Sequence, residues 1–176
     1  MSTETKEPWL NQMALATVIL AVCATLSTFK GGGYSTQSLI NQTLASDQWA
    51  FYQAKSTKQH LFEMQIDQFR LQSMPLPERS PTAIAYSKKI EQYQSEIERY
   101  SAEKKEITAK AQDFEHVRDD AKRHGKPFGM AVMFLQVAIL LNSIAGLLKK
   151  KKVWWFSCPI GLIGLVFFAD GFFTFF

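Results

Sequence analysis

The sequence predicts an all-α integral membrane protein with three transmembrane helices and a long antiparallel coiled-coil helical hairpin inserted between spans 1 and 2. Three long apolar runs predict the spans, because a bilayer core requires about 20 apolar residues of helix. The charged stretch between the first two runs predicts the insert, and two segments in it without glycine or proline predict its helices. The runs are 9–29, 128–148 and 153–176, and the insert is 30–127.

The first apolar run, 9–29, is predicted to be a retained membrane anchor rather than a cleaved signal peptide. The N-terminal tail, 1–8, contains Glu4 and Glu7, whereas a signal peptide begins with a basic region. The run is also longer than the apolar core of a typical signal peptide. Trp9, at its start, is suited to the membrane–water interface.

Glycine and proline residues divide the insert into two predicted helices. The triplet Gly31-Gly32-Gly33 should end the first span, because consecutive glycines disfavour helix. A helix over about 35–72 follows, and a proline-rich turn over 74–81 should stop it, since proline removes a backbone donor and clashes with the preceding turn. A second helix over about 82–124 should end at residues 125–127, which contain a glycine and a proline.

The second predicted helix has a coiled-coil pattern. Apolar or aromatic residues recur at alternating spacings of three and four from Ala83 to Ala121, interrupted only by Lys104 and Arg118, and mostly polar residues lie between them. Tyrosine packs less tightly than leucine at such positions, so we expect this seam to meet a helix other than an identical parallel copy. Its central residues are Ile90, Tyr93, Ile97, Tyr100, Ile107 and Phe114.

The two predicted insert helices have similar lengths, about 60 Å at 1.5 Å per residue. Both ends of the insert continue into membrane spans, so the chain must extend from the bilayer and return. The first helix is apolar on more than one face, and a helix of that kind is usually buried on several sides. One face can pack on the second helix, and the other then requires a second subunit or the membrane surface.

The short link between the second and third spans predicts the orientation of the protein in the membrane. Cytoplasmic loops carry an excess of lysine and arginine, so this link should be cytoplasmic. The N-terminus should then also be cytoplasmic and the insert extracytoplasmic. Lys122, Arg123 and Lys126 lie on the other side and oppose this orientation, but residues of long inserts count less than those of short loops. The link consists of Lys149, Lys150, Lys151 and Lys152.

Two polar residues in the apolar runs are candidate intramembrane sites. Asp170 is the one acidic residue of these runs, and an intramembrane carboxylate can serve as a proton or cation site. It lies late in the third run, so a solvated aspartate at the interface is the simpler interpretation. Asn142 lies midway along the second run, where an amide commonly bonds to a neighbouring helix; a permeation path is the alternative.

The sequence contains no pattern typical of an enzyme, a metal site or a nucleic-acid-binding protein. His60, His116 and His124 each lack a second ligand at metal-binding spacing, and no phosphate-binding loop or nucleophile elbow is present. The net charge is +4, an excess that the four lysines of the short link account for, and the insert itself has no basic stripe of the kind that binds nucleic acid. We therefore expect no enzymatic activity, no cofactor, no metal and no nucleic-acid partner.

One segment resembles the signature of an uncharacterised bacterial membrane-protein family, domain of unknown function 4337. The resemblance covers nearly the whole chain and implies the same order of a span, a helical insert and two closing spans, in a bacterial inner membrane. It implies no activity. The residues that carry it are Gly32-Gly33-Tyr34-Ser35-Thr36, the stretch from Ala45 to Ser56 with its core Ser46-Asp47-Gln48-Trp49-Ala50, and Lys58-Gln59-His60.

The same segment supplies the candidate contacts with another subunit. Its aromatic side chains project in different directions at about 100° per residue, and packing within the hairpin is the alternative interpretation. We expect a membrane-anchored structural or interaction protein that forms a homo-oligomer; a transporter or channel subunit and an accessory subunit of a larger membrane complex are the alternatives. The expected partners are membrane lipid, further copies of the chain and a possible protein at the hairpin. The candidate contact residues are Asp47, Gln48, Trp49, Phe51, Tyr52 and Lys55.

Overall fold

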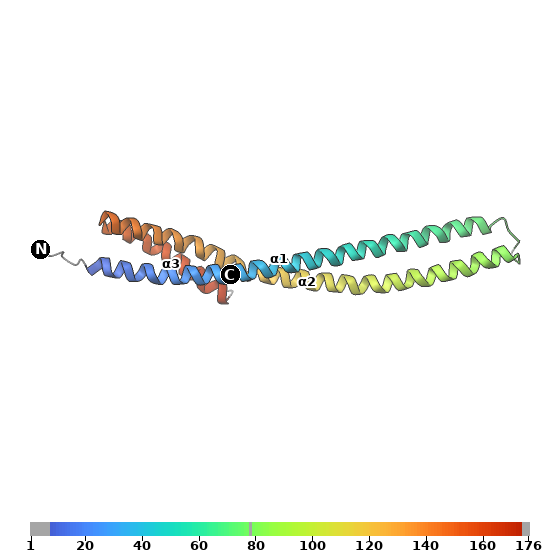
Figure 1. Cartoon of the computed structure of the whole chain (residues 1–176), viewed down its shortest axis with the longest axis horizontal. Helices are drawn as coiled ribbons and strands as arrows, with labels where there is room; N and C mark the ends of the chain where they lie inside the picture. Colours follow the sequence, from blue (N-terminus) through green and yellow to red (C-terminus); the bar gives the residue numbers. More distant parts are fainter. Residues whose placement is uncertain (1–7, 78, 174–176) are drawn as a thin grey trace. The chain divides into compact units, whose positions relative to one another are not determined.

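The computed structural model describes residues 8–77 and 79–173, and these form three α-helices without a strand. The helices are α1 (Pro8–Ser73), α2 (Pro81–Leu148) and α3 (Lys151–Phe173) (Figure 1). Each is long and apolar enough to cross a membrane by length and composition. The prediction of an all-α chain with three helices able to span a membrane is therefore confirmed. The predicted tail 1–8, apart from Pro8, and residues 174–176 of the third run lie outside the described residues.

The chain divides into two compact units. Unit 1 comprises Met1–Ile40 and Arg118–Phe176, so it contains the three apolar runs. Unit 2 comprises Asn41–Val117, which is most of the charged insert. The long helices α1 and α2 contribute residues to both units.

The predicted helix ends at Gly31–Gly33 and at residues 125–127 are wrong, because α1 continues through the glycine triplet and α2 continues through Pro127. Two of these glycines instead allow α1 and α2 to approach closely in unit 1. A β-carbon placed on Gly31 would lie 3.1 Å from the β-carbon of Phe128, and one placed on Gly125 would lie 3.2 Å from that of Tyr34. Close packing thus explains both glycines without a break in either helix.

The turn between α1 and α2 lies at the predicted prolines. After α1 ends at Ser73, the chain turns and α2 begins at Pro81. The first position of a helix suits proline, because the amide hydrogen that proline lacks would have no helical partner there. Ser80 caps the helix, since its hydroxyl oxygen accepts a hydrogen bond of 3.2 Å from the backbone N–H of Ala83.

In the core of unit 1, large side chains of α2 pack against glycines of α3. A β-carbon on Gly164 would lie 2.8 Å from the Leu135 side chain, and one on Gly171 would lie 2.8 Å from the Phe128 ring. The same match holds between α1 and α3, because a β-carbon on Gly161 would lie 3.3 Å from the Leu20 side chain. Close contacts of this kind stabilise helices in lipid, where the hydrophobic effect does not draw helices together.

The outer surface of unit 1 is apolar on all three helices. Val18, Leu140 and Leu162 are each at least 60% exposed. In water, a surface of this kind would promote association, whereas in a bilayer it meets lipid tails of the same polarity. The exposed apolar residues therefore agree with three helices that cross a membrane. Others of this set are Leu15, Val22, Phe29, Met133, Val137, Ile163 and Val166.

We predict that Gly31→Leu destabilises the protein by about 1–3 kcal/mol, because the added side chain must push α1 away from Phe128. The matched control is Gly32→Leu, since a β-carbon at Gly32 meets nothing within 4 Å and loss of a helical glycine favours the helix. Thermal unfolding in detergent would measure both variants. Equal effects of the two substitutions would contradict the close approach at Gly31.

Candidate functional site

Unit 2 is built around side-chain contacts between α1 and α2. The Phe69 ring lies 5.4 Å from that of Tyr86, and the Phe62 ring lies 4.9 Å from that of Tyr93. Lys55, earlier in α1, pairs with Glu103, later in α2. Residues late in α1 thus contact residues early in α2, so the two helices run antiparallel in this unit.

The predicted seam residues of α2 lie on the side that faces α1. Tyr100 and Ile107 are 8% and 5% exposed. The other four central residues are half-buried, and the residues between the seam positions are mostly exposed. The structure therefore brings the seam together along one face of α2. The half-buried residues are Ile90, Tyr93, Ile97 and Phe114.

The matching seam of α1 was missed by the sequence analysis. Its buried and half-buried positions also alternate spacings of three and four. The same spacing in α2 was a signal by which they could have been found. Three of these positions are polar, and the polar side chains hid the pattern. Lys55 is an example, because it is only 19% exposed although it is charged. The positions are Ala45, Gln48, Tyr52, Lys55, Gln59, Phe62, Ile66 and Phe69.

Lys55 is held between the helices by charge and by aromatic rings. Its Nζ lies 2.5 Å from a carboxylate oxygen of Glu103. The same atom lies 5.3 Å from the centre of the Phe51 ring and 5.0 Å from that of the Tyr100 ring. The hydrogen bond from Lys55 lowers the pKa of Glu103. Burial of the lysine stem and cation–π attraction both favour this position.

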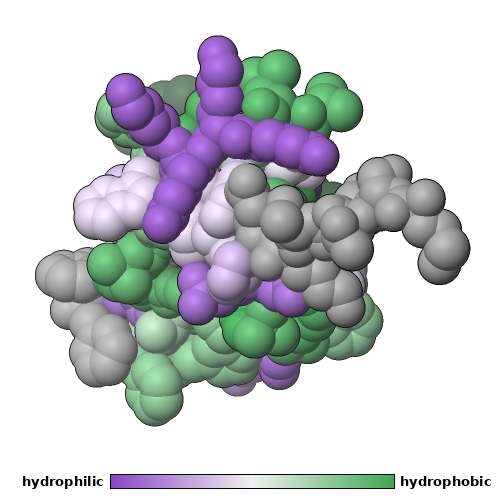
Figure 2. All heavy atoms as spheres, turned by 90° about the vertical axis from the view of Figure 1, so that its left-hand side faces the viewer, coloured by the Kyte–Doolittle hydropathy of each residue, from purple (hydrophilic) through white to green (hydrophobic). Residues whose placement is uncertain are grey.

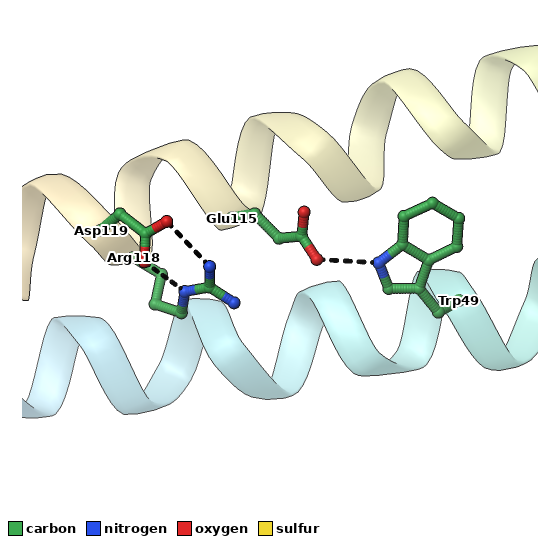
Figure 3. Close-up of polar contacts among 4 residues, drawn as sticks. All are labelled: Trp49, Glu115, Arg118 and Asp119. Atoms are coloured by element: carbon green, nitrogen blue, oxygen red, sulfur yellow. Dashed lines mark hydrogen bonds and ion pairs between the residues drawn. The ribbon is translucent and has the colours of Figure 1, made fainter.

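Trp49 also contributes to the packing of unit 2. Its indole Nε1 donates a hydrogen bond of 3.0 Å to Glu115 on α2 (Figure 3), and its ring meets the Tyr52 ring edge-on at 5.8 Å. In unit 1, Arg118 pairs with the neighbouring Asp119 at 2.7 Å (Figure 3). Trp49 is still 36% exposed, so part of its ring remains available to a partner.

The six predicted contact residues do not form one outward surface. Gln48, Tyr52 and Lys55 face α2, whereas Asp47 and Phe51 are exposed. The interpretation of packing within the insert therefore applies to the inward residues. The outward residues remain candidates for a contact with another subunit.

A polar group joins the three helices inside unit 1. The Asn142 side chain is 2% exposed, and its amide nitrogen donates a hydrogen bond of 2.9 Å to the Thr17 hydroxyl of α1. The Ser157 hydroxyl of α3 donates to the amide oxygen of Asn142. Sequence reasoning found Asn142 but not its partners, since a lone serine or threonine in an apolar run gives no signal. Both polar ends of the amide are satisfied by neighbouring helices.

Asp170 is buried, at 3% exposed, next to Gly171, which packs against the Phe128 ring. The interpretation of a solvated aspartate at the interface is therefore wrong for the folded chain. Phe128 itself is 1% exposed and lies within an aromatic cluster. Its ring contacts those of Tyr34, Phe168 and Phe172.

The four lysines lie at the link between α2 and α3, at the same end of unit 1 as the start of α1. The Trp9 and Trp154 rings are 6.2 Å apart there. Lys149 has a left-handed backbone, with φ of 50°. The amide of Lys150 donates to the carbonyl of Ala145 at 3.2 Å, and that of Lys149 to Gly146 at 3.4 Å, which is the bonding pattern of a Schellman motif that closes α2.

Within residues 8–77 and 79–173, no group of three or more histidine, cysteine, aspartate or glutamate residues could hold a metal ion. The polar residues that the structure brings together are instead those that join helices.

We predict that Asn142→Leu destabilises the three-helix unit by about 1–2 kcal/mol, because it removes the hydrogen bonds to both neighbouring helices. The matched control is Ser143→Ala, because the Ser143 hydroxyl donates its hydrogen bond to the carbonyl of Ile139 on the same helix. Unfolding in mixed micelles with increasing dodecyl sulfate would compare the two variants. An Asn142→Leu protein as stable as the control would contradict the bridging role.

Comparison with known protein families identifies a family for this chain. The model of the family described as Domain of unknown function (DUF4337) matches residues 9–174, in agreement with the resemblance found in the sequence. No curated protein and no solved structure matches the chain. The chain belongs to the family of the domain of unknown function 4337.

Proposed function

We propose that this chain is a membrane-anchored interaction protein that assembles into a homo-oligomer through a coiled-coil hairpin. The observation that carries the proposal is a second stripe on α1 in unit 2. It lies on the face opposite the seam, and its positions also alternate spacings of three and four. All of them are exposed. The stripe consists of Asp47, Ala50, Ala54, Thr57, Leu61, Met64, Gln68 and Leu71.

The half of this outward stripe that lies nearer the turn, from Leu61 to Leu71, is apolar except at Gln68. Leu61, Met64 and Leu71 are 55%, 68% and 65% exposed, although the insert is otherwise rich in charge. The other half of the stripe, from Asp47 to Thr57, contains the small residues Ala50 and Ala54, which allow close approach of another helix. A 3–4 spacing of apolar residues is the pattern that helices use to pack on helices. A second copy of the chain offers the same stripe and can pair with it symmetrically.

The hairpin assignment is supported by the seams in unit 2. Both helices place buried or half-buried residues at the heptad spacing, which is the spacing of coiled coils. A short turn joins the two helices, and each continues at its other end into a segment apolar enough to cross a membrane. This arrangement suits a hairpin that extends from the bilayer.

We assign the protein to a bacterial inner membrane, with the N-terminus and the lysine link in the cytoplasm and unit 2 outside it. Lys149–Lys152 favour the cytoplasm by the positive-inside rule. The contact between Trp9 and Trp154 supports a common side for the start of α1 and the link. The family resemblance supports a bacterial membrane.

The proposed role requires no chemical reaction. Asn142 supports a structural rather than a transport role, because its amide is used to join the three helices. The proposed partners are lipid and further copies of the chain, and the hairpin is the part that another protein could reach.

We predict that the detergent-purified protein forms oligomers and that Met64→Glu with Leu71→Glu shifts it toward the monomer, since two buried carboxylates oppose association. The control is Gln92→Glu with Gln112→Glu, which adds the same charge at exposed positions of α2. Light scattering over a concentration series gives the mass, and circular dichroism reports whether each variant keeps its helix content. A wild-type protein that is monomeric throughout the series would refute the proposal.

A further inference from the structure

We propose that the link between α2 and α3 forms a binding site for the headgroup of an anionic phospholipid. An open surface hollow of about 470 Å³ lies there and is lined by Lys151, Lys152, Trp155 and Phe156. Figure 2 faces the end of unit 1 where α2 passes into α3, and hydrophilic side chains gather there directly beside hydrophobic surface. The aliphatic stems of two lysines and two aromatic rings thus line one mostly apolar hollow, and the lysine ammonium groups lie at its edge.

The lysines supply the charge that a phosphate would require. Each ammonium group offers three hydrogen-bond donors and a full positive charge. No carboxylate of residues 8–77 or 79–173 lies within ion-pair distance of Lys149–Lys152. Four adjacent ammonium groups repel one another, and an anion between them would relieve this repulsion.

The aromatic residues favour a lipid over a soluble anion. Trp155 and Phe156 are 72% and 73% exposed, and they line the same cavity as the two lysines. Exposed apolar residues continue along α3 at Leu162 and Val166. A phospholipid places its phosphate beside the lysines and its acyl chains along the apolar face of the helix, whereas a soluble phosphate would leave the aromatic surface uncovered.

The positive-inside rule alone does not require this arrangement. It concerns the number of basic residues in a loop, and lysines that only set orientation need not line a hollow with aromatic residues. Lys149 and Lys150 are not among the cavity's lining residues. The chain therefore contains an internal control, in which two lysines line the cavity and two neighbours of equal charge do not.

The test measures which lipid lies next to the tryptophans. The full-length protein is reconstituted in bilayers of phosphatidylcholine that contain a minor fraction of brominated phosphatidylglycerol, and quenching of tryptophan fluorescence is compared with that from the same fraction of brominated phosphatidylcholine. We expect preferential quenching by the anionic lipid. We expect Lys151→Gln with Lys152→Gln to reduce this preference by roughly fivefold or more, and arginine at both positions to restore it.

The matched variant is Lys149→Gln with Lys150→Gln, which removes the same charge from the same link. The site predicts that this variant keeps most of the preference. An equal loss in both double variants would show diffuse attraction to the membrane surface and would overturn the proposal, as would the absence of a preference in the wild-type protein. Accessibility of a cysteine introduced at Ser80 reports whether each variant retains its orientation.

Discussion

The close approach of α1 and α2 in unit 1 is the constraint on which the arrangement of the chain depends. Gly31 and Gly125 occupy positions at which a β-carbon would press on the opposite helix. Because neither glycine ends its helix, each long helix continues from an apolar run into the charged insert. The span and the insert helix that follows it are therefore one structural element, although their compositions differ sharply.

Complementary side-chain size then places α3. Phe128 and Leu135 of α2 meet glycines of α3, and Asn142 meets Ser157. The glycines let the helices approach closely, and close packing favours dispersion attraction, which stabilises helices where lipid supplies no hydrophobic driving force. The hydrogen bonds of the Asn142 amide also fix how each helix is rotated about its own axis, since they form only when Thr17 and Ser157 both face the amide. Unit 1 thus combines close packing with a single polar bridge.

The sequence predicted the elements of the fold better than it predicted their ends. Apolar length alone was sufficient to predict three helices able to cross a membrane, and the 3–4 period of α2 identified the side that faces α1. The helix ends at Gly31–Gly33 were wrong because local propensity favours a break there, while tertiary packing favours a glycine in a continuous helix.

The candidate site residues were likewise predicted only in part, because the sequence indicates residue types and not their contacts. Sequence reasoning identified Asn142, yet Thr17 and Ser157 became visible only through contacts between helices distant in the chain. Lys55 was expected among the candidate subunit contacts, but its pairing with Glu103 and two aromatic rings makes the inward position favourable. Asp170 was expected at a solvated interface from its place near the end of the run, and its burial in the folded chain could not be foreseen from position alone.

Hydrogen exchange at the backbone amides of Gly32 and Gly33 tests the central claim most directly. A continuous α1 predicts exchange at these amides as slow as at neighbouring helical residues, and much slower than in the turn after Ser73, because both amides would be hydrogen-bonded within the helix. Exchange at the glycines as fast as in that turn would show a break between the span and the insert and would contradict the account.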